Sequence, residues 1–174
     1  HLYQYGRMAR VYMQHVMGVA SPTVGLINIG EEEGKGSEFE KETYRLLQEK
    51  MPSFVGNVEP NKLFKNKADC LVSTGFVGNV IIKFAEGLME AEGAVLKREI
   101  RKSPLVMLGV LLMKGALNNL RKQVDYSEYG GAPLLGVNGI VMKGHGRSSA
   151  KAIKNAIRAT IREVEHGIID QLKA

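Results

Sequence analysis

The sequence has a single cysteine and few aromatic residues, and both shortages narrow the class of protein. The lone Cys70 excludes an internal disulfide framework and suits a reducing cytoplasm. Aromatic residues make up 6% of the chain and are not interleaved with its basic residues. The net charge of +6 therefore does not indicate nucleic-acid binding, which calls for such interleaving or for a recognition motif. An anionic lipid or an acidic protein is the partner that this charge favours.

The printed sequence shows neither the pattern of a leader nor an apolar run long enough to span a membrane. Residues 1–7 show no basic region followed by an apolar one, so no signal peptide is predicted. The first residue is not methionine, which predicts a fragment or a processed piece of a longer protein. The apolar run at residues 105–113 has nine residues and is too short to span a bilayer.

Several catalytic signatures are missing. No serine stands in a nucleophile-elbow pattern, and no spacing of histidine, cysteine and carboxylate residues suggests zinc. No G-x-G-x-x-G motif is followed by an acidic residue for a ribose, which disfavours a nucleotide-dependent dehydrogenase. We therefore predict no cofactor and no metal site, although the three glutamates at residues 31–33 could ligate a hard cation.

What the sequence does contain is an alternation of apolar runs and amphipathic stretches. This alternation predicts an α/β protein with a parallel sheet covered by helices, in one domain or most of one. The predicted helices cover residues 1–18, 37–51, 79–101 and 150–172, and the predicted strands cover residues 23–29, 53–57, 68–73 and 140–143.

Three glycine-rich loops directly follow predicted strands, at residues 30–37, 74–79 and 144–149. Glycines let backbone N–H groups converge on an anion at a helix N-terminus. In doubly wound sheets ligands bind beyond the carboxyl ends of the strands, so we expect the three loops to meet at one crevice. Together they predict a small-molecule site.

The first loop reads G-E-E-E-G-K-G-S, which is one residue shorter than a P-loop. Its three glutamates would also repel a triphosphate. Lys35 lies between two glycines, so its ammonium could reach an anion held by the loop amides; a solvated turn lysine is the alternative. Ser37 could cap the helix that follows.

The other two loops each supply one polar candidate. Asn79 could cap the following helix or donate its amide hydrogens to a bound oxyanion. His145, flanked by glycines after a strand, is the best acid–base candidate among the four histidines. Cys70 lies in an apolar strand and is predicted to be a buried, inert thiol. The other histidines are interpreted as structural or solvated: His1, His15 and His166.

Residues 97–122 carry seven basic residues and one acidic residue, and the resulting +6 equals the net charge of the whole chain. The apolar run at residues 105–113 lies between these basic flanks. It could be an interfacial membrane element, a helix hairpin at an oligomer interface, or a helix buried in the core. We expect a helical protrusion that docks on a membrane surface, combined with a dimer interface.

Five stretches resemble one known family. Three of them are L-I-N-I-G-E-E-E-G-K-G at residues 26–36, G-F-V-G-N-V at 75–80 and D-Y-S-E-Y-G-G-A-P-L-L-G at 125–136. Residues 143–146, K-G-H-G, and 151–157, K-A-I-K-N-A-I, fit the same pattern. They resemble the bacterial phosphate acyltransferases of phospholipid synthesis, the PlsX family. The resemblance covers essentially the whole chain, but only the C-terminal half of the family's usual length.

This resemblance implies an α/β/α sandwich like that of the isocitrate and isopropylmalate dehydrogenases, and a homodimer associated peripherally with the inner face of the cell membrane. It implies the reaction of acyl-[acyl carrier protein] with inorganic phosphate to give acyl phosphate and free carrier protein. The acidic carrier protein suits the basic surface of the chain.

Two departures from the family pattern leave alternatives open. The family usually carries an acidic residue where this chain has Thr74, and the glycine-rich N-terminal region, one wall of the crevice, is absent. A fragment without activity that binds the membrane or the carrier protein is one alternative to the enzyme. A dehydrogenase-like enzyme on the same fold is the other.

From the resemblance and the loops we predict direct phosphorolysis of a thioester without a covalent enzyme intermediate. Lys35 and the loop amides hold phosphate, Asn79 or loop amides stabilise the oxyanion, and His145 orients phosphate or protonates the leaving thiolate. The predicted substrate-binding residues are Gly34, Gly36, Ser37, Gly75, Gly78, Gly130 and Gly131, and the predicted membrane-contact residues are Leu105, Leu108, Leu111 and Leu112.

Overall fold

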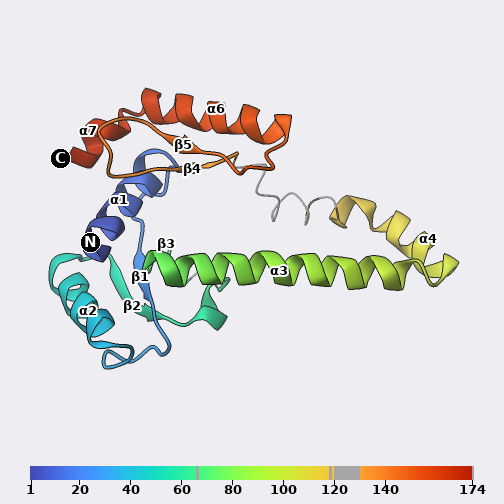
Figure 1. Cartoon of the computed structure of the whole chain (residues 1–174), viewed down its shortest axis with the longest axis horizontal. Helices are drawn as coiled ribbons and strands as arrows, with labels where there is room; N and C mark the ends of the chain where they lie inside the picture. Colours follow the sequence, from blue (N-terminus) through green and yellow to red (C-terminus); the bar gives the residue numbers. More distant parts are fainter. Residues whose placement is uncertain (66, 118, 120–129, 174) are drawn as a thin grey trace. The chain divides into compact units, whose positions relative to one another are not determined.

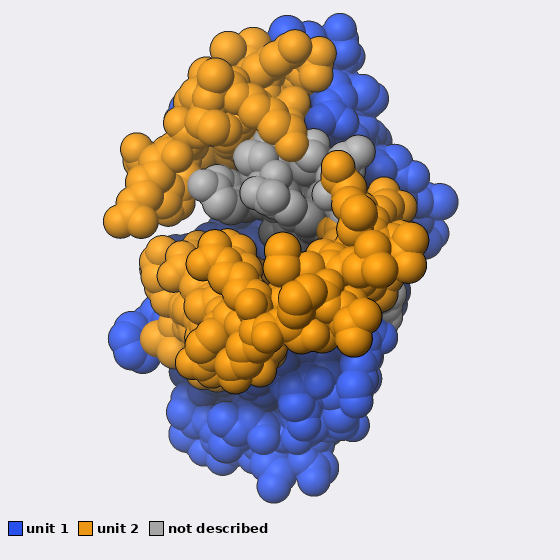
Figure 2. All heavy atoms as spheres, turned by 90° about the vertical axis from the view of Figure 1, so that its right-hand side faces the viewer, with its two compact units in different colours: residues 1–78, 133–141, 160–174 blue, residues 79–132, 142–159 orange. Residues whose placement is uncertain are grey.

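The computed structural model describes residues 1–65, 67–117, 119 and 130–173. The chain is mixed α/β, as the alternation predicts. It divides into two compact units, coloured separately in Figure 2: unit 1 comprises residues 1–78, 133–141 and 160–174, and unit 2 comprises residues 79–132 and 142–159.

Unit 1 is built on a three-stranded sheet. Its strands are β1 (Val24–Ile27), β2 (Phe54–Val58) and β3 (Cys70–Val72), in the order β2-β1-β3 (Figure 1). Both strand pairs are parallel, which confirms the parallel sheet predicted from the alternation. A Cβ on Gly25 of the central strand would lie 2.6 Å from Val58 Cγ2, so glycine is what lets β2 approach here.

Helices cover this sheet and complete the core of unit 1. Helix α1 (Leu2–His15) packs against β3, and α2 (Glu38–Lys50) packs against β2. The 3₁₀ turn η1 (Pro60–Lys62) follows β2. The core is apolar because parallel strands are covered on both faces. Its buried members are Leu2, Val24, Leu26, Leu47, Met51, Cys70 and Val72.

The C-terminal helix differs from the single helix predicted over residues 150–172. Two helices are present, α6 (Ala150–Glu165) and α7 (Ile168–Lys173). The break lies at Gly167, whose φ of +58° ends α6, and its N–H donates to the carbonyl of Val164. The prediction was wrong here because the apolar periodicity continues through the break.

Unit 2 is mainly helical. It holds α3 (Gly75–Ile100) from residue 79 onward and α4 (Pro104–Leu112), which starts with proline at its first position. Two short strands, β4 (Ala132–Pro133) and β5 (Met142–Lys143), pair with each other. Helices α3 and α4 contain no buried residue, in contrast to the helices of unit 1.

Candidate functional site

The carboxyl edge of the unit 1 sheet carries two buried asparagines beneath the first glycine loop. Asn28 follows β1 and is 5% exposed, and Asn57 lies near the end of β2 and is 1% exposed. Asn57 pairs in register with Leu26 of β1, and the backbone N–H of Asn28 donates to the carbonyl of Val58 at 3.1 Å. The sheet therefore fixes where both amide side chains begin.

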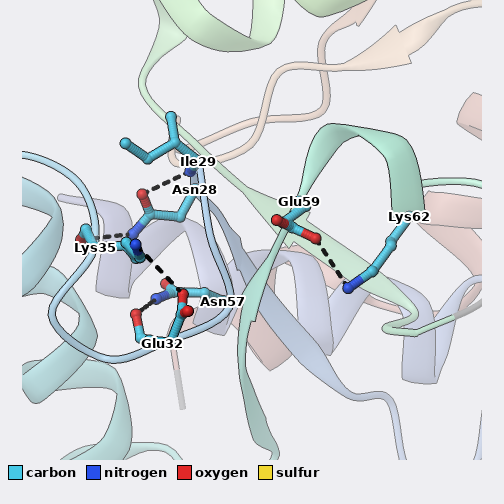
Figure 3. A network of polar contacts seen from close by, with 7 residues as sticks. All are labelled: Asn28, Ile29, Glu32, Lys35, Asn57, Glu59 and Lys62. Atoms are coloured by element: carbon cyan, nitrogen blue, oxygen red, sulfur yellow. Dashed lines mark hydrogen bonds and ion pairs between the residues drawn. The ribbon is translucent and has the colours of Figure 1, made fainter.

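Both asparagines hold carbonyls of the loop at residues 30–37 (Figure 3). Asn28 Nδ2 donates to the Lys35 carbonyl at 2.9 Å, and Asn57 Nδ2 donates to the Glu32 carbonyl at 2.9 Å. The Lys35 N–H donates to the same Glu32 carbonyl at 3.1 Å. The loop is thus a turn closed on itself and tied to the sheet by two buried amides, and it is not an open P-loop.

The side chain of Lys35 leaves this turn toward solvent. It is 48% exposed, and its Nζ lies 3.9 Å from Glu32 Oε2, a pair too long and too exposed to hold the ammonium firmly. The stem crosses Gly30, because a Cβ built there would lie 2.8 Å from Lys35 Cγ. The side chain is therefore exposed, which fits both an anion-binding lysine and a solvated turn lysine, and its role in binding stays a prediction.

The three glutamates of the loop do not act as one acidic cluster. Glu31 forms ion pairs with Lys62, at 3.1 Å, and with Lys67. Lys62 also pairs with Glu59 at 2.9 Å (Figure 3). Glu31 thus pairs with the basic residues around η1, whereas Glu32 lies beside Lys35. This divergence leaves Glu31 paired elsewhere, so the negative charge beside Lys35 is smaller than the three consecutive glutamates suggest.

Ser37 is the N-cap of α2, which confirms the capping prediction. It forms a capping box with Glu40: the Ser37 N–H donates to Glu40 Oε2 at 2.9 Å, and the Ser37 hydroxyl donates to the same oxygen. The hydrogen bond from the Ser37 side chain lowers the pKa of Glu40. A phosphate bound by Ser37 would have to displace this carboxylate.

Two glycines of the loop differ in how far the backbone requires them. Gly36 has a φ of +88°, and a Cβ there would lie 2.7 Å from Asn28 Oδ1. Gly34 lies in open space, with no atom within 4 Å of a Cβ. Gly36 is therefore needed for the turn itself, whereas Gly34 leaves room for a ligand at its backbone.

The second loop starts α3 four residues earlier than predicted. The helix begins at Gly75, and Thr74 Oγ1 accepts a hydrogen bond from the Val77 N–H at 3.3 Å. Thr74 therefore caps α3, and the prediction that Asn79 caps it was wrong. Threonine keeps the capping ability that an acidic residue would have at this position. Asn79 lies exposed in the second turn, and Gly75 and Gly78 lie in the first.

The third loop holds His145 in a defined turn. The Arg147 N–H donates to His145 Nδ1 at 3.1 Å, and the Ser148 N–H donates to the His145 carbonyl at 2.9 Å. A neutral imidazole that accepts at Nδ1 carries its proton on Nε2. The ring is exposed. The Nε2–H of His145 is therefore a hydrogen-bond donor that a ligand of unit 2 could reach.

Gly130 and Gly131 are packed closely in unit 2. Gly130 has a φ of +82°, and a Cβ there would lie 2.1 Å from the Ala156 nitrogen of α6. A Cβ on Gly131 would lie 2.8 Å from the carbonyl of Lys143 on β5. Packing alone explains both glycines, and their substrate-binding role stays a prediction. The preceding D-Y-S-E-Y at residues 125–129 lies outside the described residues.

Cys70 is buried on β3, as predicted. Burial, with a smaller effect of the neighbouring Asp69 carboxylate, raises the pKa of its thiol to about 11. The thiol therefore stays protonated near neutral pH and is unsuited to act as a nucleophile.

The apolar run at residues 105–113 forms α4, whose side chains are exposed. Leu105 and Leu112 are 80% and 82% exposed, and Leu108 and Leu111 are exposed as well. The alternative of a helix buried in the core is therefore wrong for the chain as described. Its basic flank includes Lys97, Arg98, Arg101 and Lys102, whereas Arg121 and Lys122 lie outside the described residues. Within the part of the chain that the structure covers, no helix combines the length and apolarity needed to cross a membrane.

Comparison with known proteins decides the family. The family model described as "Fatty acid synthesis protein" matches residues 1–171. The chain belongs to this family. A phosphate acyltransferase of Pelobacter propionicus is 48% identical over 99% of this chain and 50% of its own length. One from Citrifermentans bemidjiense is 53% identical over 91% of this chain and 45% of its own, and one from Clostridium perfringens is 49% identical over 99% and 51%.

These relatives confirm the resemblance to phosphate acyltransferases, and they also confirm that the match is partial. The chain spans about half the length of the curated relatives it matches. In this chain, Lys35 lies in unit 1, and Asn79 and His145 lie in unit 2. The convergence of the three loops on one crevice stays a prediction. In the described ranges, no three histidine, cysteine, aspartate or glutamate side chains are grouped so that they could hold a metal ion.

Sequence reasoning missed the two asparagines that shape the first loop of this family member. Asn28 interrupts the apolar run at residues 23–29, and Asn57 ends the predicted strand at residues 53–57. A buried polar residue in such a run needs a hydrogen-bonding partner, and this was the signal available. The partner is a loop carbonyl in both cases, which no local pattern specifies.

Proposed function

We propose that the complete protein is a phosphate acyltransferase that converts acyl-[acyl carrier protein] and inorganic phosphate to acyl phosphate for phospholipid synthesis. The observation that carries this proposal is the shared name of relatives that are 48–53% identical over nearly all of this chain. A dehydrogenase-like activity is not favoured by these names. We further propose that the complete fold is the sandwich of the isopropylmalate dehydrogenases, of which the chain forms the C-terminal portion, with a protrusion at residues 97–122.

In this proposal the first loop binds phosphate. The exposed ammonium of Lys35 provides the charge, and the backbone N–H groups of Gly34 and Gly36 provide hydrogen bonds, with Ser37 joining once Glu40 is displaced. Phosphate is already nucleophilic, so the enzyme must orient it and needs no covalent intermediate. The accessible Lys35 and its weak pairing with Glu32 support this role.

The second and third loops act on the thioester. A phosphate oxygen attacks the carbonyl carbon, a C–O bond forms, and the C–S bond then breaks to release the carrier-protein thiolate. The Asn79 amide and the Gly75 N–H stabilise the oxyanion, at about 3 kcal/mol per donor. Gly78, whose own N–H donates to the Thr74 carbonyl at 2.9 Å, lines the same subsite without supplying a donor. His145 orients the phosphate through its Nε2–H, or, once the imidazole has taken up a second proton in place of the Arg147 N–H hydrogen bond, it acts as an imidazolium that gives a proton to the thiolate. Gly130 and Gly131 complete the predicted substrate-binding set.

The protein is proposed to act as a homodimer at the inner face of the cell membrane. The exposed α4 leucines, Leu105, Leu108, Leu111 and Leu112, would enter the lipid interface, and the basic flanks would meet anionic headgroups. The basic surface also suits the acidic acyl carrier protein. These partners match the chemistry of a lipid precursor that is made from a soluble carrier and delivered to a membrane.

Lys35→Ala tests the catalytic part of this proposal. We expect the KM for phosphate to rise at least about tenfold, because the loop loses its charged ligand. The measurement is phosphate-dependent release of carrier-protein thiol by the complete protein. Lys41→Ala, in the next helix, is the matched control, since it removes one positive charge that is paired with Glu38 at 2.7 Å. Wild-type kinetics in Lys35→Ala would rule out this role of the lysine.

A further inference from the structure

The backbone of Lys35 is held at both of its polar groups. Its N–H donates to the Glu32 carbonyl at 3.1 Å, and its carbonyl accepts from Asn28 Nδ2 at 2.9 Å. The Glu32 carbonyl is itself held by Asn57 Nδ2 at 2.9 Å. Neither asparagine touches the ammonium in these contacts; both act on the peptide groups from which the lysine side chain starts (Figure 3).

The two asparagines are fixed more firmly than a loop residue would be. Asn28 adds a second bond, since its Oδ1 accepts from the Ile29 N–H at 2.8 Å, and Asn57 is paired with Leu26 in the sheet register. Both side chains are more than nine-tenths buried. A buried amide has no water with which to replace a hydrogen bond that it breaks. The two loop carbonyls are therefore held firmly against the edge of the sheet.

The path of the Lys35 side chain is fixed as well. The stem runs over Gly30, where a Cβ would lie 2.8 Å from Lys35 Cγ and 2.9 Å from Glu32 Oε2. Gly30 shows no positive φ, so its lack of a side chain is not explained by backbone conformation. Space for the lysine stem is the explanation that the contacts give.

We propose that Asn28 and Asn57 are positioning residues for Lys35, and that Gly30 keeps the path of its stem open. Together they aim the ammonium at the phosphate subsite, so that the lysine binds phosphate without reorganisation of the loop. This proposal rests on the proposed function. The alternative is a purely structural role, in which the asparagines stabilise the fold and affect phosphate binding through that stability alone.

A double-mutant cycle separates the two alternatives. Asn28→Ala should raise the KM for phosphate about tenfold with kcat changed less than about twofold, since a binding group is misplaced. On a Lys35→Ala background the same substitution should change that KM less than about twofold, because the residue through which it acts is gone. A purely structural role would give the same KM change on both backgrounds.

Gly30→Ala is a second variant that does not rely on removing a buried polar group. The three atoms nearest to the added methyl belong to the flexible side chains of Lys35 and Glu32, so the chain should fold normally. It should raise the KM for phosphate about fivefold on the wild-type background and have no further effect on Lys35→Ala. An unchanged KM in folded Gly30→Ala would overturn the proposed stem path.

The matched control is Thr43→Ala. Thr43 Oγ1 donates to the Phe39 carbonyl at 2.8 Å, so this variant also loses a hydrogen bond from a buried side chain to a backbone carbonyl, but it lies within α2. Its unfolding temperature should fall as that of Asn28→Ala does, while its KM for phosphate stays within about twofold of the wild-type value. A comparable KM rise in Thr43→Ala would overturn the positioning role.

The outcomes also separate this proposal from the proposed function. If the complete wild-type protein releases no thiol on addition of phosphate, the proposed function is wrong. If it does release thiol but Lys35→Ala leaves the KM for phosphate unchanged, the role of the lysine and the positioning role that depends on it are both wrong. If Lys35→Ala raises the KM but Asn28→Ala raises it equally with and without Lys35, the positioning role alone is wrong. Far-UV circular dichroism of every variant confirms that the compared proteins are folded.

Discussion

Of two apolar segments in this molecule, strand β1 is buried and helix α4 is exposed. Strand β1 supplies Val24 and Leu26, which are completely buried between helices and neighbouring strands. Helix α4 is more apolar than any other described helix, yet it contains no buried residue. Apolar composition therefore predicts that a segment gains free energy when it is buried. Whether other parts of the same chain bury it depends on the rest of the fold.

The difference also separates two kinds of function. Strand β1 forms part of the sheet edge from which Asn28 and Asn57 hold the loop of Lys35. Its contribution is to keep that edge rigid. The uncovered segment has basic flanks and a continuous apolar surface, and its proposed value lies in what it can bind. Substitutions in unit 1 should therefore act on stability and on the loop, and substitutions in α4 should act on association.

The largest expected effect is that of Leu26→Ala on stability. Truncating a fully buried leucine should lower the free energy of unfolding by about 2–5 kcal/mol, from lost burial and the cavity left behind. Leu112→Ala is the matched control, and it should change that free energy by less than about 0.5 kcal/mol. Urea unfolding followed by circular dichroism measures both. An equal loss of unfolding free energy in both variants would mean that α4 is buried in solution, and the contrast between β1 and α4 would be wrong.

Leu108→Glu and Leu112→Glu test the uncovered segment directly. Each should weaken binding to vesicles of phosphatidylglycerol at least about tenfold, because an apolar anchor is replaced by a charge that the lipid repels. Phe39→Glu, a similar change at an exposed position of α2, should leave vesicle binding unchanged. Flotation of the protein with the vesicles measures the effect. Undiminished flotation of both α4 variants would assign the segment to the dimer interface instead.

A third effect concerns a buried polar contact of unit 1. The Tyr12 hydroxyl of α1 donates to Glu163 Oε1 of α6 at 3.2 Å, and Glu163 is 2% exposed. Burial, with the nearby Glu163 carboxylate, raises the pKa of Tyr12 to about 12. Tyr12→Phe leaves a buried carboxyl without this donor and should cost about 1–2 kcal/mol in thermal or urea unfolding. Tyr5→Phe, at an exposed position, should be neutral, and a neutral Tyr12→Phe would contradict the structural weight given to the contact.

How much of this could be read from the sequence depends on the range of the interaction. The capping of α2 by Ser37 and the apolar strands were predictable, because a cap and a strand are specified within a few residues. The capping by Thr74 was missed because the glycines at 75 and 78 suggested a loop, although both lie within α3. The exposure of α4 was expected from the basic residues on both sides of it, since a nine-residue apolar run by itself reads the same whether covered or not.

In the candidate site, too, features specified within a few residues were predicted and contacts between distant residues were missed. Lys35 was found because glycines flank it, whereas Asn28 and Asn57 were missed because their partners lie seven and 25 residues away in the chain. A hydrogen bond across that separation is specified by the register of the sheet, and register is a property of the folded chain. The Glu31 pair with Lys67, 36 residues apart, was beyond local pattern for the same reason.

The smallest expected effect is a change in the pH dependence of stability, from Glu163. Burial raises the pKa of its carboxyl, and the hydrogen bond from Tyr12 only partly offsets this. The folded protein therefore binds this proton more tightly than the unfolded chain, so its contribution is fully present below the ordinary pKa of 4.5 and is lost as pH rises through the raised value. Glu163→Gln removes that loss, and its unfolding temperature relative to wild type should rise with pH across the window. Glu165→Gln, an exposed neighbour on α6, removes the same charge and should show no such trend; parallel profiles for all three proteins would mean that the carboxyl of Glu163 is not desolvated.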